Sequence, residues 1–579
     1  MSAHSFKKAL RNGSSALALS TIALIGAPAA QATDGIFGGG STLASLAERT
    51  LSANFYGFSN VVLLYAAIGS GSGQRIFISN DPGQGFLGNG LDPATPPVYL
   101  FPSLGFSTYP YPRIDYGASD SPLPANFTTG YTTTVYNWDQ VNHTRTATGS
   151  VSYPTASYGQ PIQLPLFEAP VAVAVNLPEV SQSTGTTVAG GVTWTIKSQL
   201  PASPAPFGGR IQLSTAQICA IFSGLVTNWN DSTTTIPTLL SDGTNSTEGF
   251  ADANTWRAGS TPGTGGGTAY AGSSTPIKIV YRQDGSGTSF IFTNYLKTVC
   301  PLLDPTNAYG YQSIFATSVL PNNSFTQLIN KVTAYGRSLN TLGADGSDAV
   351  AAAIGNSSAN YGYIGYLSAD FVQPNNTATT SPYAANVQND YLRFKGVYHP
   401  GQTPTGTTVP ADFATPSPLG AEAAWAALTV PTTANFNDWN VYAQTWSANT
   451  NLPGSPVYPN TGWVDIGGRS ILPLAAGDGA YPITGTAYGY FYSCYGQGRD
   501  SVAASTRVTD VVQYLKWHYN RLSGSNAEDV IVVNGFGPLP TTWTSVIEST
   551  YLSSSSTSIE AYGGTPAKGC TGVTGTGAQ

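Results

Sequence analysis

Charged side chains are scarce in this chain of 579 residues. Asp, Glu, Lys and Arg make up 9% of it, against roughly 25% in typical soluble proteins. Surface polarity must therefore come from uncharged side chains, which suits an exported protein. The formal net charge is -7 and the sequence contains no basic stripe, so we do not expect a nucleic-acid partner, which would need a basic face.

Long apolar runs are also missing, apart from one near the N-terminus. A basic segment at residues 7–11 precedes an apolar stretch at about residues 16–27 and the small residues Ala30-Gln31-Ala32. This order is typical of a secretory signal peptide, with cleavage expected between Ala32 and Thr33. A membrane anchor is the weaker alternative, because the run is short and is broken by Gly and Pro. We expect the mature chain to lack a transmembrane segment and to be periplasmic or secreted.

Cysteine and histidine are few, with four of each. An even number of cysteines in an exported chain indicates disulfides, and the sequence alone allows three pairings of Cys219, Cys300, Cys494 and Cys570. Their spacing matches no metal site. The histidines are scattered, and neither a GxSxG nor an HExxH motif is present. We therefore expect no metal and no cofactor.

Three glycine-rich turns each lead into a stretch with helical spacing of apolar residues: residues 38–43 (GGGSTL), 69–73 (GSGSG) and 284–288 (DGSGT). A β-branched run, Ile277 to Tyr281, precedes the third turn and predicts a strand. The N-terminus of a helix leaves N–H groups unpaired and carries a partial positive charge, so it binds anions. Three such turns from distant parts of the chain predict helix N-termini that meet around one small anion.

Two charged residues would complete an anion site. Arg282 has a planar guanidinium that can bind two oxygens of one tetrahedral anion. Asp120 follows a predicted strand, and an ionised carboxylate accepts the proton that hydrogen phosphate keeps and sulfate lacks. The alternative is structural: ordinary strand-to-helix turns, and an Asx turn at Asp120.

These motifs together resemble the periplasmic phosphate-binding proteins of high-affinity phosphate import, and more closely the DING proteins, which are their secreted relatives. The segments that carry the resemblance run in the family's order through nearly the whole mature chain. They are GGGSTL (38–43), YAAIGSGSGQRIF (65–77), YGASDSPL (116–123), LSTAQICAIFSGLVTNWND (213–231), VYRQDGSGTSFIFTNYL (280–296), GSDAV (346–350), IGYLSADFV (364–372), YPITG (481–485) and NGFGPLP (534–540).

The resemblance implies an α/β fold of the periplasmic-binding-protein (Venus-flytrap) type, with two lobes and long insertions. Lobe I would comprise residues 33–168 and 371–579, with an insertion at about 400–480, and lobe II residues 169–370. The apolar run Val171 to Val175 would cross between the lobes. The disulfides implied by the family pattern are Cys219–Cys300 and Cys494–Cys570.

The resemblance also implies a ligand set, carried over motif by motif: Thr42, Leu43, Ser70, Asp120, Arg282, Ser286, Gly287 and Thr288. Asp284 would hold the guanidinium of Arg282 in place. Two departures are visible. The family's usual Ala-Thr-Leu-Pro is Ser41-Thr42-Leu43-Ala44 here, which keeps the contacting pair, and its name-giving Asp-Ile-Asn-Gly is replaced at residues 34–37.

The expected function is binding of inorganic phosphate by a monomeric, exported substrate-binding protein, with a phosphate ABC transporter as a candidate partner. One alternative is phosphatase activity, but the sequence shows no base beside the candidate nucleophiles Ser70, Ser286 or Thr42. The other is an adhesive or structural role at the cell surface, suggested by the insertions at 80–112, 124–160, 181–197, 237–275 and 400–480.

Overall fold

The protein is described by a computed structural model that covers residues 35–85, 111–124, 126–139, 144–178, 184–197, 211–239, 245–251, 268–376, 378–389, 413–426, 428, 479–553, 559–564 and 569–579. The predicted signal peptide and most of the predicted insertions at 80–112 and 400–480 lie outside these ranges. All described residues belong to one compact unit, Asp34–Gln579. No helix within the described ranges is long and apolar enough to cross a membrane.

Nine strands of the described chain form one sheet, in the order β13-β12-β14-β6-β18-β3-β1-β2, with β15 paired to β6. Their bounds are β1 Gly35–Gly40, β2 Val62–Ala67, β3 Tyr116–Ser119, β6 Pro161–Val175, β12 Lys278–Arg282, β13 Thr341–Ala344, β14 Tyr363–Ser368, β15 Tyr383–Ala384 and β18 Thr484–Tyr492. Strand β1 is parallel to β2 and β3, and β12 is parallel to β13 and β14. The sheet thus contains two parallel groups, and antiparallel strands lie between them.

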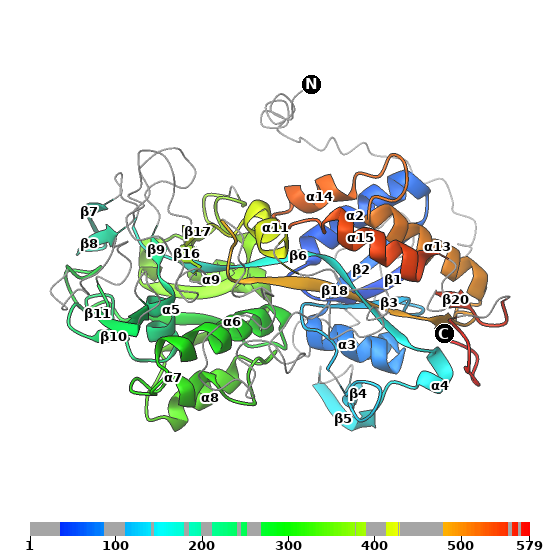
Figure 1. The fold of residues 1–579 in the computed structure, drawn as a ribbon, viewed down its shortest axis with the longest axis horizontal. Helices are drawn as coiled ribbons and strands as arrows, with labels where there is room; N and C mark the ends of the chain where they lie inside the picture. Colours follow the sequence, from blue (N-terminus) through cyan, green and yellow to red (C-terminus); the bar gives the residue numbers. More distant parts are fainter. Residues whose placement is uncertain are drawn as a thin grey trace. The chain divides into compact units, whose positions relative to one another are not determined.

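Strands β6 and β18 join the two parallel groups, and Figure 1 shows them side by side. The first part of β6 pairs with β18, and its second part, Val171 to Val175, pairs with β14. Strand β18 pairs in turn with β3. Every residue of β6 and β18 is buried, which explains why the predicted crossing run is continuously apolar.

The pairing of β6 with β18 contains a bulge. Its register shifts between Ala487 and Tyr488, so that Leu166 has no partner residue on β18. Two side chains following one another along the chain bind the carbonyls at this point: His518 Nε2 lies 2.8 Å from the Leu166 oxygen, and the Tyr519 hydroxyl donates to the Pro165 oxygen at 2.8 Å. Burial lowers the pKa of His518 to about 4, so the ring is neutral near pH 7 and its role is structural.

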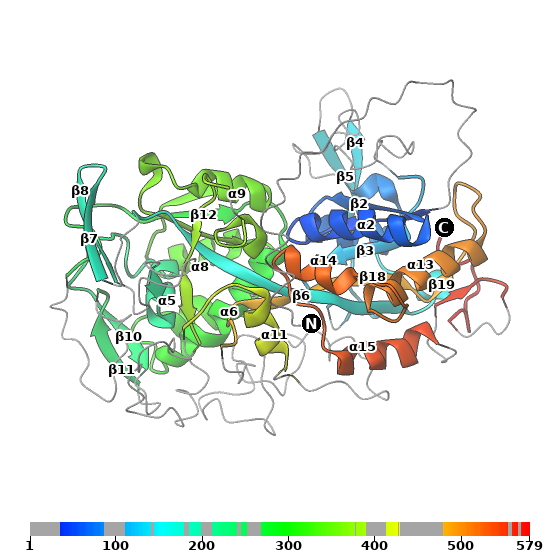
Figure 2. The same cartoon turned by 90° about the horizontal axis from the view of Figure 1, so that it is seen from above.

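Helices cover both faces of the first parallel group. They are α2 Ser45–Ser59, α3 Ser70–Ser79, α13 Ala504–His518, α14 Ala527–Val533 and α15 Thr541–Ile547. Leu51 of α2 shares a core with Leu63 of β2, whereas the next residue, Leu64, packs on the opposite face with Ile76 of α3, as the alternation of a strand requires. Figure 2 shows α14 beside α2.

The second parallel group is covered in the same way. Its helices are α5 Thr215–Phe222, α6 Gly287–Leu303, α7 Tyr311–Phe315, α8 Thr326–Ala334 and α9 Gly346–Ile354. Phe292 of α6 stacks on Tyr366 of β14, with ring centroids 4.5 Å apart. On the other face, Ile354 of α9 packs with Val280 of β12.

Three antiparallel pairs of strands occupy predicted insertions: β4 Thr133–Asp139 with β5 Thr144–Val151, β7 Thr184–Ala189 with β8 Val192–Lys197, and β10 Thr235–Leu239 with β11 Asn245–Gly249. Two small sheets contain β9 Gln212–Leu213, β16 Asn386–Gln388 and β17 Phe413–Ala414, and β19 Cys494–Tyr495 with β20 Glu560–Ala561. The other helical segments are η1 Pro82–Gln84, α4 Thr155–Tyr158, η3 Ser358–Asn360, η4 Ala369–Phe371, α11 Pro418–Ala426 and the π-helix η7 Glu548–Leu552.

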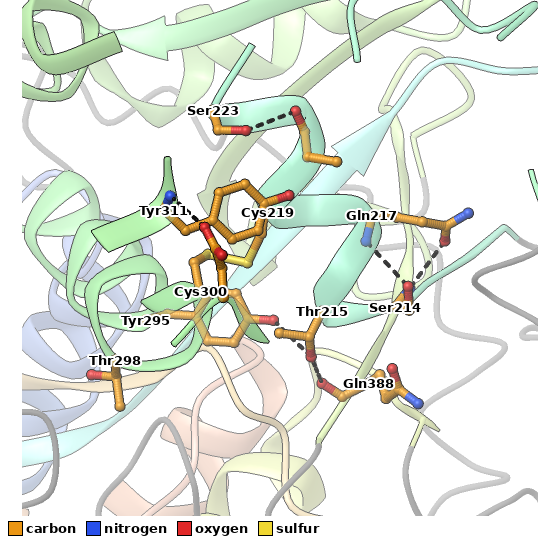
Figure 3. The surroundings of a disulfide bond; sticks show 12 residues. Ser214, Thr215, Gln217, Cys219, Ser223, Tyr295, Thr298, Cys300, Tyr311 and Gln388 are labelled. Atoms are coloured by element: carbon orange, nitrogen blue, oxygen red, sulfur yellow. Dashed lines mark hydrogen bonds between the residues drawn. A yellow bond between two sulfur atoms is a disulfide. The ribbon is translucent and has the colours of Figure 1, made fainter. Parts of the chain in front are cut away.

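Two disulfides link elements that are far apart in sequence. Cys219 of α5 is bonded to Cys300 of α6, and Cys494 of β19 to Cys570, the pairs that the family resemblance implies. Figure 3 shows the surroundings of the first disulfide. There the Thr215 hydroxyl donates to the Gln388 carbonyl at 3.2 Å, so a hydrogen bond to β16 also holds the start of α5 in place.

Helix α3 approaches the sheet without an intervening side chain at Gly73. A Cβ there would lie 2.1 Å from the Ala118 carbonyl oxygen and 2.7 Å from Gly40 Cα. We expect Gly73→Ala to lower the free energy of unfolding by about 1–3 kcal/mol through overpacking, although Ala is the better helix former. At Gly57 nothing lies within 4 Å of an added Cβ. Gly57→Ala should therefore raise the free energy of unfolding, measured in urea, by about 0.5–1 kcal/mol. Stabilisation of both variants would contradict the close approach.

Candidate functional site

The helices predicted from the glycine turns, α2, α3 and α6, begin beside one another. Ser70, the first residue of α3, lies with its Oγ 3.2 Å from Asp120 Oδ2. At Gly287, the first residue of α6, a Cβ would lie 2.5 Å from Asp120 Cβ and 2.6 Å from Ser70 Oγ. The hydroxyl of Thr42, just before α2, accepts a hydrogen bond from Arg282 Nη2 at 2.7 Å. Side chains from both parallel groups therefore meet here.

Several backbone N–H groups at these helix starts have no acceptor among the described residues. In the described part of the chain no carbonyl or side chain accepts a hydrogen bond from the N–H groups of Thr42, Leu43, Gly287 or Thr288. Leu43 and Thr288 are fully buried, and a buried donor without an acceptor is costly. An anion with several oxygens would satisfy such a set of donors.

Arg282 lies at the end of β12 and is buried. Its Nε donates to Asp284 Oδ1 at 2.6 Å, and its Nη2 forms an ion pair with Asp284 Oδ2. Its Nη1 donates to the hydroxyls of Thr288 at 3.2 Å and Ser347 at 3.3 Å. Burial by itself would lower the pKa of Arg282, but the charge and hydrogen bond of Asp284, together with the charges of Tyr366 and Asp120, outweigh this effect and the pKa is raised. The guanidinium is therefore a fixed cation.

Asp120 follows β3 and is 2% exposed. Its Oδ2 accepts hydrogen bonds from Ser41 Oγ at 2.5 Å and from Ser70 Oγ at 3.2 Å. Its Oδ1 is buried and has no hydrogen-bond partner among the described residues. Burial raises the pKa of Asp120 to about 6, and the hydrogen bonds from the two serines and the charge of Arg282 oppose this rise. One carboxylate oxygen is thus an unpaired buried acceptor at neutral pH.

The predicted ligands Ser286 and Leu43 also make contacts of their own with neighbouring residues. Ser286 is the N-cap of α6: its Oγ accepts from Ser289 N–H at 3.3 Å, and its own N–H donates to the Asn323 oxygen at 2.9 Å. The Leu43 side chain is buried in the core, and its carbonyl accepts from Ser368 Oγ at 3.4 Å. Only the backbone N–H of Leu43 can serve an anion.

Two residues of the site were not predicted from the sequence. Ser347, the second residue of α9, contacts Arg282, and Ser41 contacts Asp120. Ser41 was visible only as a departure from the family pattern. The expectation that no base accompanies Ser70 is wrong, because the Asp120 carboxylate accepts its hydroxyl hydrogen. In the described ranges, no group of three or more His, Cys, Asp and Glu residues could hold a metal ion.

Residues 27–515 match the family model of a PBP superfamily domain. The chain belongs to the PBP superfamily. A solved structure of a high-affinity periplasmic phosphate-binding protein, PfluDING, bound with phosphate is similar, with a TM-score of 0.52 and 21% identity, over 93% of this chain and 98% of that one. The match confirms the predicted two-lobed α/β fold of the superfamily.

Two curated relatives are similar in sequence. The chain is 24% identical over 346 residues to a phosphate-binding protein of an unknown prokaryotic organism, covering 60% of this chain and 68% of the relative. It is 26% identical over 286 residues to alkaline phosphatase L of Pseudomonas aeruginosa strain UCBPP-PA14, covering 49% of this chain. The match spans 56% of the length of alkaline phosphatase L.

The raised pKa of Asp120 predicts a pH dependence of stability. Because burial raises this pKa from 3.8 to about 6, the folded protein binds the proton more tightly than the unfolded chain. The free energy of unfolding of wild type should therefore fall by roughly 3 kcal/mol, relative to Asp120→Asn, as the pH rises from about 4 to about 6, and the difference should then level off. Urea unfolding of the anion-free proteins between pH 4 and 8 measures it. A difference that does not vary with pH would contradict the raised pKa.

Proposed function

We propose that the protein binds inorganic phosphate, as an exported substrate-binding protein for phosphate uptake or scavenging. The observation that carries this proposal is Asp120 Oδ1, an unpaired buried acceptor beside unpaired N–H groups and a fixed guanidinium. The donors suit an anion with several oxygens, and the acceptor suits an anion that keeps a proton. Hydrogen phosphate has both properties, whereas sulfate has no proton to donate near neutral pH.

The proposed ligands divide by what they contribute. The backbone N–H groups of Thr42, Leu43, Gly287 and Thr288, with the hydroxyls of Thr42, Ser70, Ser286 and Thr288, donate to the phosphate oxygens. Arg282 binds two oxygens and is held by Asp284. Asp120 accepts the phosphate proton. Ser70 and Thr42 would exchange their present contacts with Asp120 and Arg282 for contacts with the ligand.

In this proposal lobe I comprises residues 33–168 and 371–579, and lobe II comprises residues 169–370. Four hydrogen bonds between described residues near the site would then join the lobes: Arg282 to Thr42 at 2.7 Å, Gly71 N–H to the Gly285 oxygen at 3.4 Å, Ser368 to the Leu43 oxygen at 3.4 Å, and Ser121 to Asn323. Closure over the anion would exclude water and strengthen the electrostatic interactions. The proposal also includes export by the signal peptide at 1–32, delivery of phosphate to a phosphate ABC transporter, and a monomeric state of the protein. The name of the phosphate-binding relative supports it.

The direct test is calorimetric titration of the refolded, anion-free protein with phosphate and sulfate at pH 7.5. We expect phosphate binding with a Kd of about 1 μM or tighter, a free energy of about -8 kcal/mol. Sulfate should bind roughly 100-fold more weakly, because its oxygens would face the unpaired carboxylate oxygen. In Asp120→Asn the preference should fall at least about tenfold, since an amide can donate to sulfate.

A matched control is Asp370→Asn. Asp370 is also a buried carboxyl, and burial raises its pKa to about 7, but it makes no described contact with the site. This variant should keep the affinities of wild type. Equal affinity of wild type for the two anions, or no phosphate binding, would refute the proposed function.

A second candidate function is hydrolysis of phosphate monoesters. It is favoured by the match with alkaline phosphatase L and by the Ser70 hydroxyl, which donates to a carboxylate that can accept its proton. Release of nitrophenol from p-nitrophenyl phosphate would then be abolished in both Ser70→Ala and Asp120→Asn. Activity that survives in both variants would exclude this pair as the source.

A further inference from the structure

Ser41 forms hydrogen bonds with four other residues through its backbone and its side chain, although its side chain is not among the proposed ligands. It is fully buried. Its N–H donates to the Ala118 oxygen at 3.2 Å, and its carbonyl accepts from the Tyr65 hydroxyl at 2.6 Å. Its Oγ accepts from the Ala44 N–H at the start of α2, at 3.2 Å, and donates to Asp120 Oδ2 at 2.5 Å. The hydroxyl hydrogen is therefore committed to Asp120.

Ser70, the other donor to Asp120, differs in this respect. A hydroxyl has one hydrogen and can donate to one acceptor at a time. In the proposed complex Ser70 donates to phosphate, so it can no longer donate to Asp120. Ser41 then provides the remaining hydroxyl donor to Oδ2. The N–H of Ala44 polarises this hydroxyl, because it belongs to the positive end of α2.

We propose that Ser41 is a positioning residue that keeps Asp120 ionised and oriented, with Oδ1 free for the proton of the bound anion. Ser41 thereby sets the lowest pH at which the site still rejects an oxyanion that has no proton. This inference rests on the proposed function and adds a determinant of its specificity.

The other groups that face Asp120 do not supply the same control. Arg282 from β12 favours the ionised carboxylate, but it is paired with Asp284. Tyr65 of β2 and Tyr490 of β18 also feel the charge of Asp120. Burial raises the pKa of both tyrosines, so they stay neutral throughout the range in which Asp120 titrates.

A more distant acid on α2 titrates in a different range. Glu48 interacts with Tyr65 rather than with Asp120. Burial raises the pKa of Glu48 to about 8, so it is protonated while Asp120 changes its charge. The selectivity change that we expect below pH 7 therefore reports on Asp120.

Sulfate is the probe of this device, because its charge stays constant between pH 5 and 8. Once Asp120 is protonated, its O–H can donate to a sulfate oxygen, so sulfate affinity should rise as the pH falls. Loss of a hydrogen bond to the charged form destabilises that form by an amount equivalent to about one pH unit. In Ser41→Ala the midpoint of the rise should lie about one pH unit higher than in wild type.

The experiment measures sulfate and phosphate affinity from pH 5 to 8 for wild type and variants. Ser41→Thr retains a hydroxyl and should keep the midpoint of wild type. Ser52→Ala is the matched control. It removes a different buried hydroxyl, which lies on α2 and donates to the Glu48 carbonyl at 2.7 Å. This variant should also leave the midpoint unchanged. Ser41→Gly removes the same hydroxyl as Ser41→Ala and replaces that variant if it fails to fold.

The outcomes separate this inference from the proposed function. Normal phosphate binding with the same sulfate midpoint in wild type, Ser41→Ala and Ser41→Gly would overturn the role of Ser41 alone. Failure of wild type to bind phosphate would overturn the proposed function. In that case the role of Ser41 can still be tested in the anion-free protein, by following the carboxyl ¹³C resonance of Asp120 as the pH is changed. A titration midpoint that rises by about one pH unit in the variants supports the hydrogen-bond argument, and an unchanged midpoint refutes it.

Discussion

Two buried charges of opposite sign lie close together in this protein without forming an ion pair. Arg282 is bound by Asp284, while Asp120 accepts two serine hydroxyls. Burial of a charge is expensive unless hydrogen bonds replace the lost water. Each charge therefore has its own set of partners, and one carboxylate oxygen is still left over. The surrounding helix starts, strand ends and hydroxyls can be understood as the means by which the fold offsets this cost.

The sheet delivers these partners from strand ends. Gly40, Ser119 and Arg282 are the last residues of β1, β3 and β12, and in parallel α/β sheets ligands bind beyond the carboxyl ends of strands. Ser41 and Asp120 follow directly after two of these ends. The pairing of β6 with β18 connects the parallel groups that contribute them. The pairing of strands thus decides the positions of side chains that are far apart in sequence.

The sequence predicted best those features of the structure that arise from interactions between residues close together along the chain. The glycine turns and their helices were predictable because local chemistry produces them, whereas the Asp284 partner of Arg282 followed from the family resemblance. The Val171 to Val175 run was visible because both of its faces are buried. Strand β5 is exposed almost throughout, so it shows no alternation, and the surrounding region 124–160 reads only as poorly periodic. The contact of Ser41 with Asp120 spans 79 positions, and no local pattern announces it. The sequence left three disulfide pairings open, and the observed one is both the simplest, local pairing and the one that the family resemblance implies.

The bulge at Leu166 has a mechanical consequence. Three prolines, Pro161, Pro165 and Pro170, lie in the part of β6 that pairs with β18, and none of them can donate a backbone hydrogen bond to that strand. A ribbon that lacks these donors and carries an extra residue bends there at lower cost than along an uninterrupted ladder. His518 and Tyr519 fasten the end of α13 to this same point. Helix α13 therefore supports β6 on one side of Leu166. We expect bending of the paired strands β6 and β18 to be concentrated on the other side.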